Sequence, residues 1–164
     1  MGRSKRAVAV VLLGCLTMVL SGCGYKVTAD ISKYANSKIQ VLGVNKGSVT
    51  MTVSDLSKFN CKKKKITTKS SGGEVTVTAV GPSLEDLLKG CGSTISDFES
   101  VKFTAKDGYV KELNSDFFVV HPDLYLSLCN GENPLKKDEQ PVRLVIPGVT
   151  ADNWVKGVVK IEVK

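Results

Sequence analysis

Apolar and polar residues alternate over several short segments, in the period-two pattern of half-buried β-strands. The clearest case is residues 74–80, where Val75, Val77 and Ala79 alternate with polar neighbours. Other β-rich segments are 39–44, 48–53, 62–69, 101–104, 109–113, 124–129, 142–146 and 158–163. Short turn sequences such as Asn-Lys-Gly at 45–47 separate them. The pattern predicts a domain built mainly from strands.

One segment instead has the three-and-four spacing of a helix. Leu84, Leu87 and Leu88 form an apolar stripe after Ser83, a suitable N-cap, and Gly90 is a suitable end. Acidic residues at 85 and 86 lie in the first turn, where the helix dipole favours them, so we interpret them as structural. Ser54 is expected to cap a second, short helical turn over 54–59. Strands with one or two short helices predict a single α+β domain.

The beginning of the chain has a different pattern. A basic head with Arg3, Lys5 and Arg6 precedes an apolar run over 7–20. This run is shorter than the roughly 20 residues of a membrane-spanning helix, which favours a signal peptide. It ends in Leu-Ser-Gly-Cys at 20–23, which resembles the lipobox of bacterial lipoproteins. The alternative is a plain signal peptide that happens to contain a cysteine.

This resemblance implies that Cys23 is the lipid attachment site and that the chain has three parts. Residues 1–22 are the expected signal peptide, 23–37 the lipidated cysteine with a polar tether, and 38–164 the folded domain. The expected localisation is extracytoplasmic, with a lipid anchor in the bacterial cell membrane and a preference for a Gram-positive surface. The membrane is therefore the first expected partner.

Charge adds one candidate surface. The formal net charge is +7, and removal of residues 1–22 takes away three basic residues and no acidic one, which leaves +4. Four consecutive lysines at 62–65 contribute much of this charge. They are interpreted as a solvated edge or face; the alternative is contact with acidic lipid headgroups or wall polymer, where each lysine contributes about 1 kcal/mol. Aromatic residues are only 6%, so no nucleic-acid partner is expected.

The cysteines give no recognisable metal or redox motif. Processing would leave Cys61, Cys91 and Cys129 beside the acylated Cys23, so at most one disulfide could form. Their spacing matches no metal-binding signature, and the chain has one histidine, His121. Cys129 lies in an apolar run and is expected to be a buried small hydrophobe.

Several later motifs occur in a characteristic order. They are GPSLEDLL at 81–88, DGY at 107–109, NGENPL at 130–135, PVRLVIPG at 141–148 and Val-Lys at 155–156. In this order the segment from about 49 to 163 resembles the oxidoreductase molybdopterin-binding domain family, in a small single-domain form. The resemblance implies the sulfite-oxidase-type fold.

The departures from the family pattern concern the metal. In the catalytic members a cysteine thiolate ligates molybdenum from the strand before the helix, but the matching segment 62–70 contains no cysteine. Cys61 lies at the beginning of this strand, earlier than the family position. Asn133 extends the family's Asn-Gly-Glu-Pro-Leu loop. Of the basic residues that hold the pterin phosphate and the oxyanion substrate, Arg143 and Lys156 match.

Two functions follow as predictions. The favoured one is a non-catalytic binding or accessory module, with no metal, no cofactor and no catalytic residue expected. Its ligand, a small molecule or an envelope protein, would occupy a cleft formed by Asp107, Tyr109, Arg143, Trp154 and Lys156. The alternative is an active molybdopterin-dependent oxidoreductase of the sulfite oxidase type, in which Cys61 or a non-thiolate ligand completes the metal site. Trp154 could instead be a core residue.

Overall fold

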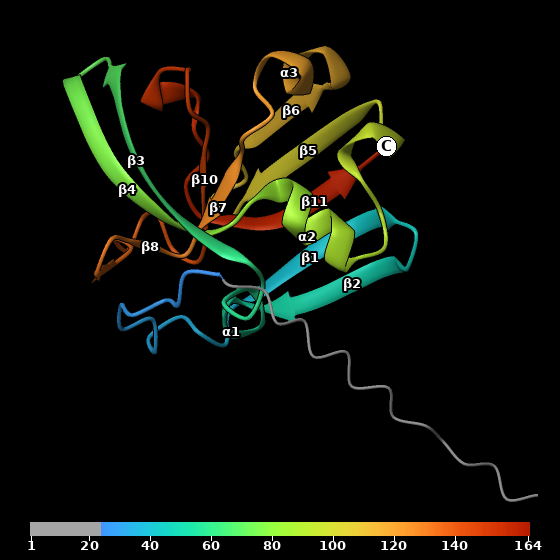
Figure 1. Ribbon diagram of the computed structural model, residues 1–164, viewed down its shortest axis with the longest axis horizontal. Helices are drawn as coiled ribbons and strands as arrows, with labels where there is room; N and C mark the ends of the chain where they lie inside the picture. Colours follow the sequence, from blue (N-terminus) through green and yellow to red (C-terminus); the bar gives the residue numbers. More distant parts are fainter. Residues whose placement is uncertain (1–23) are drawn as a thin grey trace, which may run out of the picture.

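The computed structural model describes residues 24–164; the expected signal peptide and Cys23 lie outside the described residues. The largest sheet has five strands, in the order β2-β1-β11-β5-β6. Their bounds are β1 Lys38–Val44, β2 Gly47–Thr52, β5 Ser100–Ala105, β6 Val110–Asn114 and β11 Val158–Val163. The β1–β11 pair is parallel and the other pairs are antiparallel. This sheet forms one layer of the domain (Figure 1).

Two smaller sheets complete the strand framework. One has the order β3-β4-β8-β9 and the other pairs β10 with β7. Their bounds are β3 Cys61–Ser70, β4 Gly73–Pro82, β7 Tyr125–Ser127, β8 Cys129–Asn130, β9 Asn133–Pro134 and β10 Arg143–Val145. The β3–β4 hairpin is long and curves away from the body at its turn (Figure 1). Gly81 lets β4 pass against β7, because a Cβ atom there would overlap the carbonyl oxygen of Leu126.

The described residues contain three short α-helices. They are α1 Val53–Leu56, α2 Leu84–Gly90 and α3 Ser115–Val120, with 3-10 turns η1 at Ile95–Asp97 and η2 at Ala151–Asn153. The predicted cap of α2 is confirmed: Ser83 Oγ accepts a hydrogen bond from the Asp86 backbone N–H at 3.1 Å. In α1 the cap is Thr52, in a reciprocal capping box with Asp55, and not Ser54 as predicted. The third helix, α3, was not predicted.

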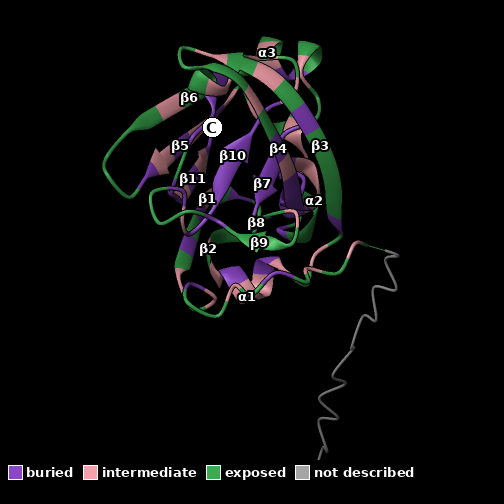
Figure 2. Cartoon of the chain, turned by 90° about the vertical axis from the view of Figure 1, so that its left-hand side faces the viewer, coloured by how far each residue is buried: buried purple, intermediate pink, exposed green. Residues whose placement is uncertain are grey.

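The hydrophobic core lies between the large sheet, the smaller sheets and α2. Strand β5 shows the period-two rule directly, since Val101, Phe103 and Ala105 are buried and the residues between them are partly exposed. The leucine stripe of α2 is buried as expected. Buried residues run through the centre of the molecule, whereas exposed residues lie mainly on the outer strands and loops (Figure 2). The predicted strand-rich single domain is confirmed; no helix within residues 24–164 is long and apolar enough to cross a membrane.

The segment 24–37 differs from the polar tether that its composition predicted. Tyr34 is buried in the core, where its hydroxyl donates to the Leu128 carbonyl at 2.7 Å and accepts from the Leu135 N–H at 3.0 Å. The backbone N–H of Tyr25 donates to the Cys61 carbonyl at 2.7 Å. A few anchoring contacts suffice to hold a polar segment on the domain, and polar composition alone does not reveal them.

Candidate binding site

A hollow of about 440 Å³ lies beside strand β4 and is lined by several polar and charged side chains that could hold a ligand. Residues 75–77 of β4 form one wall, and Asn130 and Asn133 come from the ends of β8 and β9. The charged groups that line it are Lys136, Glu139, Arg143 and Lys156. We call it the basic hollow, because three cationic side chains face one carboxylate.

Arg143 is the buried centre of this hollow. Strand β10 places it, and Nη1 of its guanidinium lies 2.6 Å from the Glu139 Oε1 atom. The two residues are 8% and 6% exposed, so their pairing takes place away from water. On another side the guanidinium lies 4.9 Å from the ring of Trp154, within cation–π range. The Arg143 Nε atom is buried and has no hydrogen-bond partner in the described chain, so it is an available donor.

The other cations are more exposed. Lys156 pairs with Asp138 at 2.8 Å, and both side chains are more than half exposed. Lys136 is exposed at the rim. The basic hollow therefore combines one buried, paired guanidinium with two exposed lysines, a set that suits an anionic group on a small ligand.

The five residues of the predicted cleft do not form one cleft. Asp107, Tyr109, Trp154 and Lys156 line a shallower hollow of about 220 Å³, and Arg143 does not reach it. Lys156 borders both hollows. Trp154 is 5% exposed and donates from Nε1 to the Ile146 carbonyl at 2.9 Å, so it is chiefly a core residue.

Sequence reasoning missed the partner of Arg143 and the amide groups of the basic hollow. Glu139 lies four residues before Arg143 on the other side of Pro141, in a segment without helical or strand periodicity. Asn130 and Asn133 were recognised as turn residues and as part of the NGENPL motif, with Asn133 as an extension of that loop, but not as members of the candidate cleft. Their spacing carried no signal that the β8–β9 turn folds against β4.

The three described cysteines are all unpaired and buried. Cys61 is 1% exposed, and its sulfur lies 3.7 and 3.8 Å from the carbonyl oxygens of Ser57 and Leu56. Burial raises the pKa of Cys61 to about 11. Burial likewise raises the pKa of Cys129 to about 11 and the pKa of Cys91 above its usual value. These thiols stay protonated at neutral pH, whereas a metal ligand must be a thiolate.

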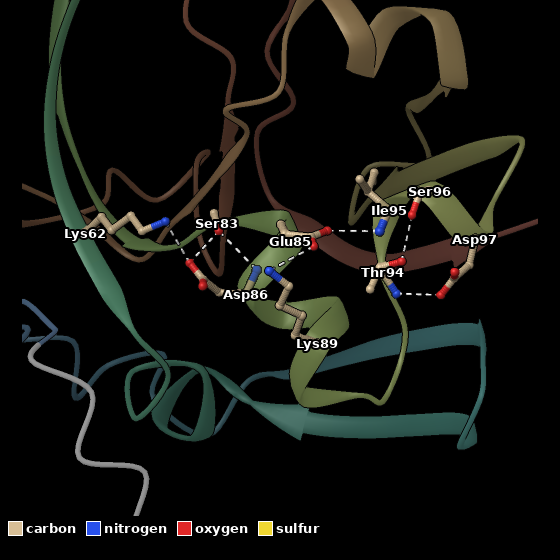
Figure 3. A network of polar contacts seen from close by, with 9 residues as sticks. All are labelled: Lys62, Ser83, Glu85, Asp86, Lys89, Thr94, Ile95, Ser96 and Asp97. Carbon is tan, nitrogen blue, oxygen red and sulfur yellow. Dashed lines mark hydrogen bonds and ion pairs between the residues drawn. The ribbon is translucent and has the colours of Figure 1, made fainter.

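The paired acids of α2 have structural roles (Figure 3). Glu85 accepts from the Ile95 N–H at 2.9 Å and pairs with Lys89 at 3.2 Å. Asp86 lies 3.1 Å from Lys62 of β3 and also bonds Ser83. Burial alone would raise the pKa of Asp86, but the hydrogen bonds from Ser83 and Lys62 together lower it. The network ties α2 to the beginning of β3.

The three sheets, the capped helix after β4 and the basic hollow together define a sulfite-oxidase-type molybdopterin-binding fold. The chain belongs to the oxidoreductase molybdopterin binding domain family, whose model matches residues 26–164. The crystal structure of the sulfane dehydrogenase SoxCD from Paracoccus pantotrophus is similar, with a TM-score of 0.67 and 16% identity. The match covers 79% of this chain and 38% of that chain, and at this identity it shows the fold. No curated protein matches the chain.

The described residues, 24–164, do not fit a molybdenum ion held by a protein thiolate. Segment 62–70 has no cysteine, Cys61 is packed in the core, and no described thiol lines the basic hollow. Within residues 24–164 no group of three or more His, Cys, Asp or Glu side chains could hold a metal. Arg143 and Lys156, the two basic residues that match the family pattern, do both line the basic hollow.

Proposed function

We propose that this protein is a lipid-anchored, extracytoplasmic binding module that uses the family scaffold without a molybdenum site. The observation that carries this proposal is the burial of all three described thiols, with pKa values raised by that burial. None of the thiols in residues 24–164 is then available as the protein ligand that the resemblance implies for the enzymes. The scaffold then serves binding.

The ligand that the basic hollow supports is a small molecule with an anionic group. Its volume of about 440 Å³ is within the range of ordinary ligand sites. Arg143 offers an unpartnered buried donor, and Lys136 and Lys156 add positive charge at the opening. Glu139 neutralises part of this charge and orients the guanidinium. The anchor at Cys23 would hold this site outside the cytoplasmic membrane.

The decisive experiment is to produce the full chain in a bacterium that makes molybdopterin. Molybdenum is measured by elemental analysis and pterin by fluorescence after acid oxidation, with a molybdopterin enzyme from the same host as the positive control. We expect folded protein with neither component above background. Near-stoichiometric amounts of both would overturn the proposal, and Cys61→Ser would then test the sulfur ligand.

The same preparation tests binding, with inorganic pyrophosphate as the anionic probe in isothermal titration calorimetry. Lys156→Gln removes one charged contact of the basic hollow and should weaken binding about tenfold or more. Lys111→Gln, on strand β6, is the matched control and should leave the dissociation constant unchanged. An equal effect of both variants would show that pyrophosphate responds only to net charge.

A further inference from the structure

The lysines Lys62–Lys65 near the beginning of β3 form a charged stretch of that strand, which we call the lysine edge; successive lysines project to opposite faces of the hairpin. All four are exposed, and among the strands of residues 24–164 only β4 pairs with β3, so β3 is an edge strand. We propose that the lysine edge lies on anionic lipid headgroups beside the lipid attachment point, and so fixes the orientation of the domain on the membrane. This inference rests on the proposed anchor at Cys23.

The position of the chain's beginning supports this orientation. The Tyr25 N–H bonds the carbonyl of Cys61, the first residue of β3. A Cβ atom on Gly24 would lie 2.9 Å from the Asn60 side-chain oxygen, so Gly24 lies directly against the approach to β3. Figures 1 and 2 both show the described chain beginning beside the beginning of β3. Consecutive Cα atoms are about 3.8 Å apart, so a lipid on Cys23 would be one residue from this contact.

Two of the four lysines already have interaction partners within the domain. Lys62 pairs with Asp86, as Figure 3 shows. Lys63 donates to the Tyr25 hydroxyl at 3.2 Å and lies 5.0 Å from the centre of its ring. This hydrogen bond raises the pKa of Lys63, and the nearby Glu132 contributes in the same direction.

Lys64 and Lys65 have no such partner. Neither has an acidic group within 4.0 Å among the described residues, and their cross-strand partners on β4 are the uncharged Ala79 and Thr78. These two lysines are therefore the cations that remain available to an external anion. An anionic membrane surface would supply the counter-charge that the domain lacks at this edge.

Protection of an open sheet edge is the competing explanation. Charged side chains on an edge strand prevent pairing with other chains, and lysine is common in this role. A glutamate at the same position would also protect the edge, since it carries a full charge. Membrane contact, by contrast, requires a positive charge. Replacement of lysine by glutamate separates the two explanations.

The expected contribution of Lys64 and Lys65 to membrane binding can be measured on a protein that carries a single acyl chain. One myristoyl chain gives reversible binding with an association constant of about 10⁴ M⁻¹. Each lysine near an anionic surface adds about fivefold, so Lys64 and Lys65 together add about 25-fold. Two weak signals of this kind are what stable membrane attachment usually needs.

The experiment uses residues 23–164, which contain the whole described domain, with one myristoyl chain coupled to Cys23 through a maleimide. Cys61, Cys91 and Cys129 are buried, so the maleimide is expected to couple at Cys23. Partitioning is measured on phosphatidylcholine vesicles with and without phosphatidylglycerol. The proteins compared are the wild type, Lys64→Glu/Lys65→Glu, and the control Lys111→Glu/Lys137→Glu. The control changes the net charge equally, and Figure 2 shows β6, which carries Lys111, on the opposite side of the molecule from β3.

We expect the wild type to bind the anionic vesicles about 25-fold more tightly than the neutral ones, and the lysine-edge variant to lose this preference. The control should keep most of it. Equal binding of the wild type to both vesicles, or an equal loss in the control, would overturn the proposal. Because the myristoyl chain is coupled chemically, this result does not depend on whether cells attach a lipid to Cys23. That modification is tested separately, by measuring the intact mass of the mature protein after expression of the full chain in bacteria.

Discussion

Two groups of basic side chains in this domain have opposite environments: one is buried and paired, and the other is exposed and unpaired. Arg143 is buried in the basic hollow and has a carboxylate, Glu139, and an aromatic ring, Trp154, arranged around it. In the lysine edge, Lys64 and Lys65 are exposed and have no acidic partner in the described chain. The buried cation is part of the fold, and the exposed ones are available for contacts outside it.

The two environments predict different effects of substitution on folding stability. A buried ion loses its hydration, so it depends on its partner, and removal of one member leaves the other uncompensated. An exposed lysine remains solvated whatever its neighbours, and its effect on stability is small. Substitutions in the two regions should therefore act on different observables: folding stability for the basic hollow and surface binding for the lysine edge.

The largest expected effect is at the buried pair. Arg143→Met keeps much of the side-chain volume but leaves the Glu139 carboxylate buried without its cation. We expect the free energy of unfolding to fall by about 3–5 kcal/mol. The measurement is urea denaturation followed by circular dichroism, with the midpoint compared at constant m-value.

The exposed pair of Lys156 with Asp138 is the matched control for this substitution. Lys156→Met should change the free energy of unfolding by no more than about 1 kcal/mol. Addition of Glu139→Leu to Arg143→Met should restore part of the loss, because no unpaired charge then remains. If Arg143→Met cost as little as Lys156→Met, the buried pair would be dispensable and the contrast between the two regions would be wrong.

Features that depend on residues close together in the sequence were predicted correctly, whereas features that depend on irregular loops or distant residues were not. The hairpin of β1 and β2 and the cap of α2 depend on residues within a few positions of one another, and both were predicted. The contact of Glu139 with Arg143 depends on an irregular loop, and no periodicity marks it. Helix α3 has Val119 and Val120 exposed, so it lacks the apolar stripe that identifies a helix.

Composition was an equally poor guide to the structure of segment 24–37. Its polar residues predicted a tether, but Tyr34 connects it to Leu128 and Leu135, about a hundred residues away in the chain. The predicted cleft failed for a similar reason. Its five residues were grouped by the family resemblance, whereas in the structure Arg143 lines the basic hollow and Asp107 and Tyr109 line the second hollow.

An intermediate effect is expected at Tyr34. Tyr34→Phe keeps the ring but removes the hydroxyl that joins the Leu128 carbonyl to the Leu135 N–H, which are then left without this partner. The free energy of unfolding should fall by about 1–3 kcal/mol. Tyr109→Phe, at a half-exposed position, is the control and should stay within about 0.5 kcal/mol of the wild type. A neutral Tyr34→Phe in the same denaturation assay would mean that 24–37 is only loosely attached.

The smallest effect on stability is expected at the lysine edge. Lys64→Glu/Lys65→Glu should change the free energy of unfolding by no more than about 0.5 kcal/mol, because both side chains are exposed and neither has a partner to lose. The new carboxylates would also lie beside Lys62 and Lys63, which offsets part of the like-charge repulsion in the run. Unchanged urea denaturation together with lost vesicle binding would show that these lysines serve membrane binding and not folding stability. A large loss of stability would instead show that the lysine edge, like Arg143, is held in place by the domain itself.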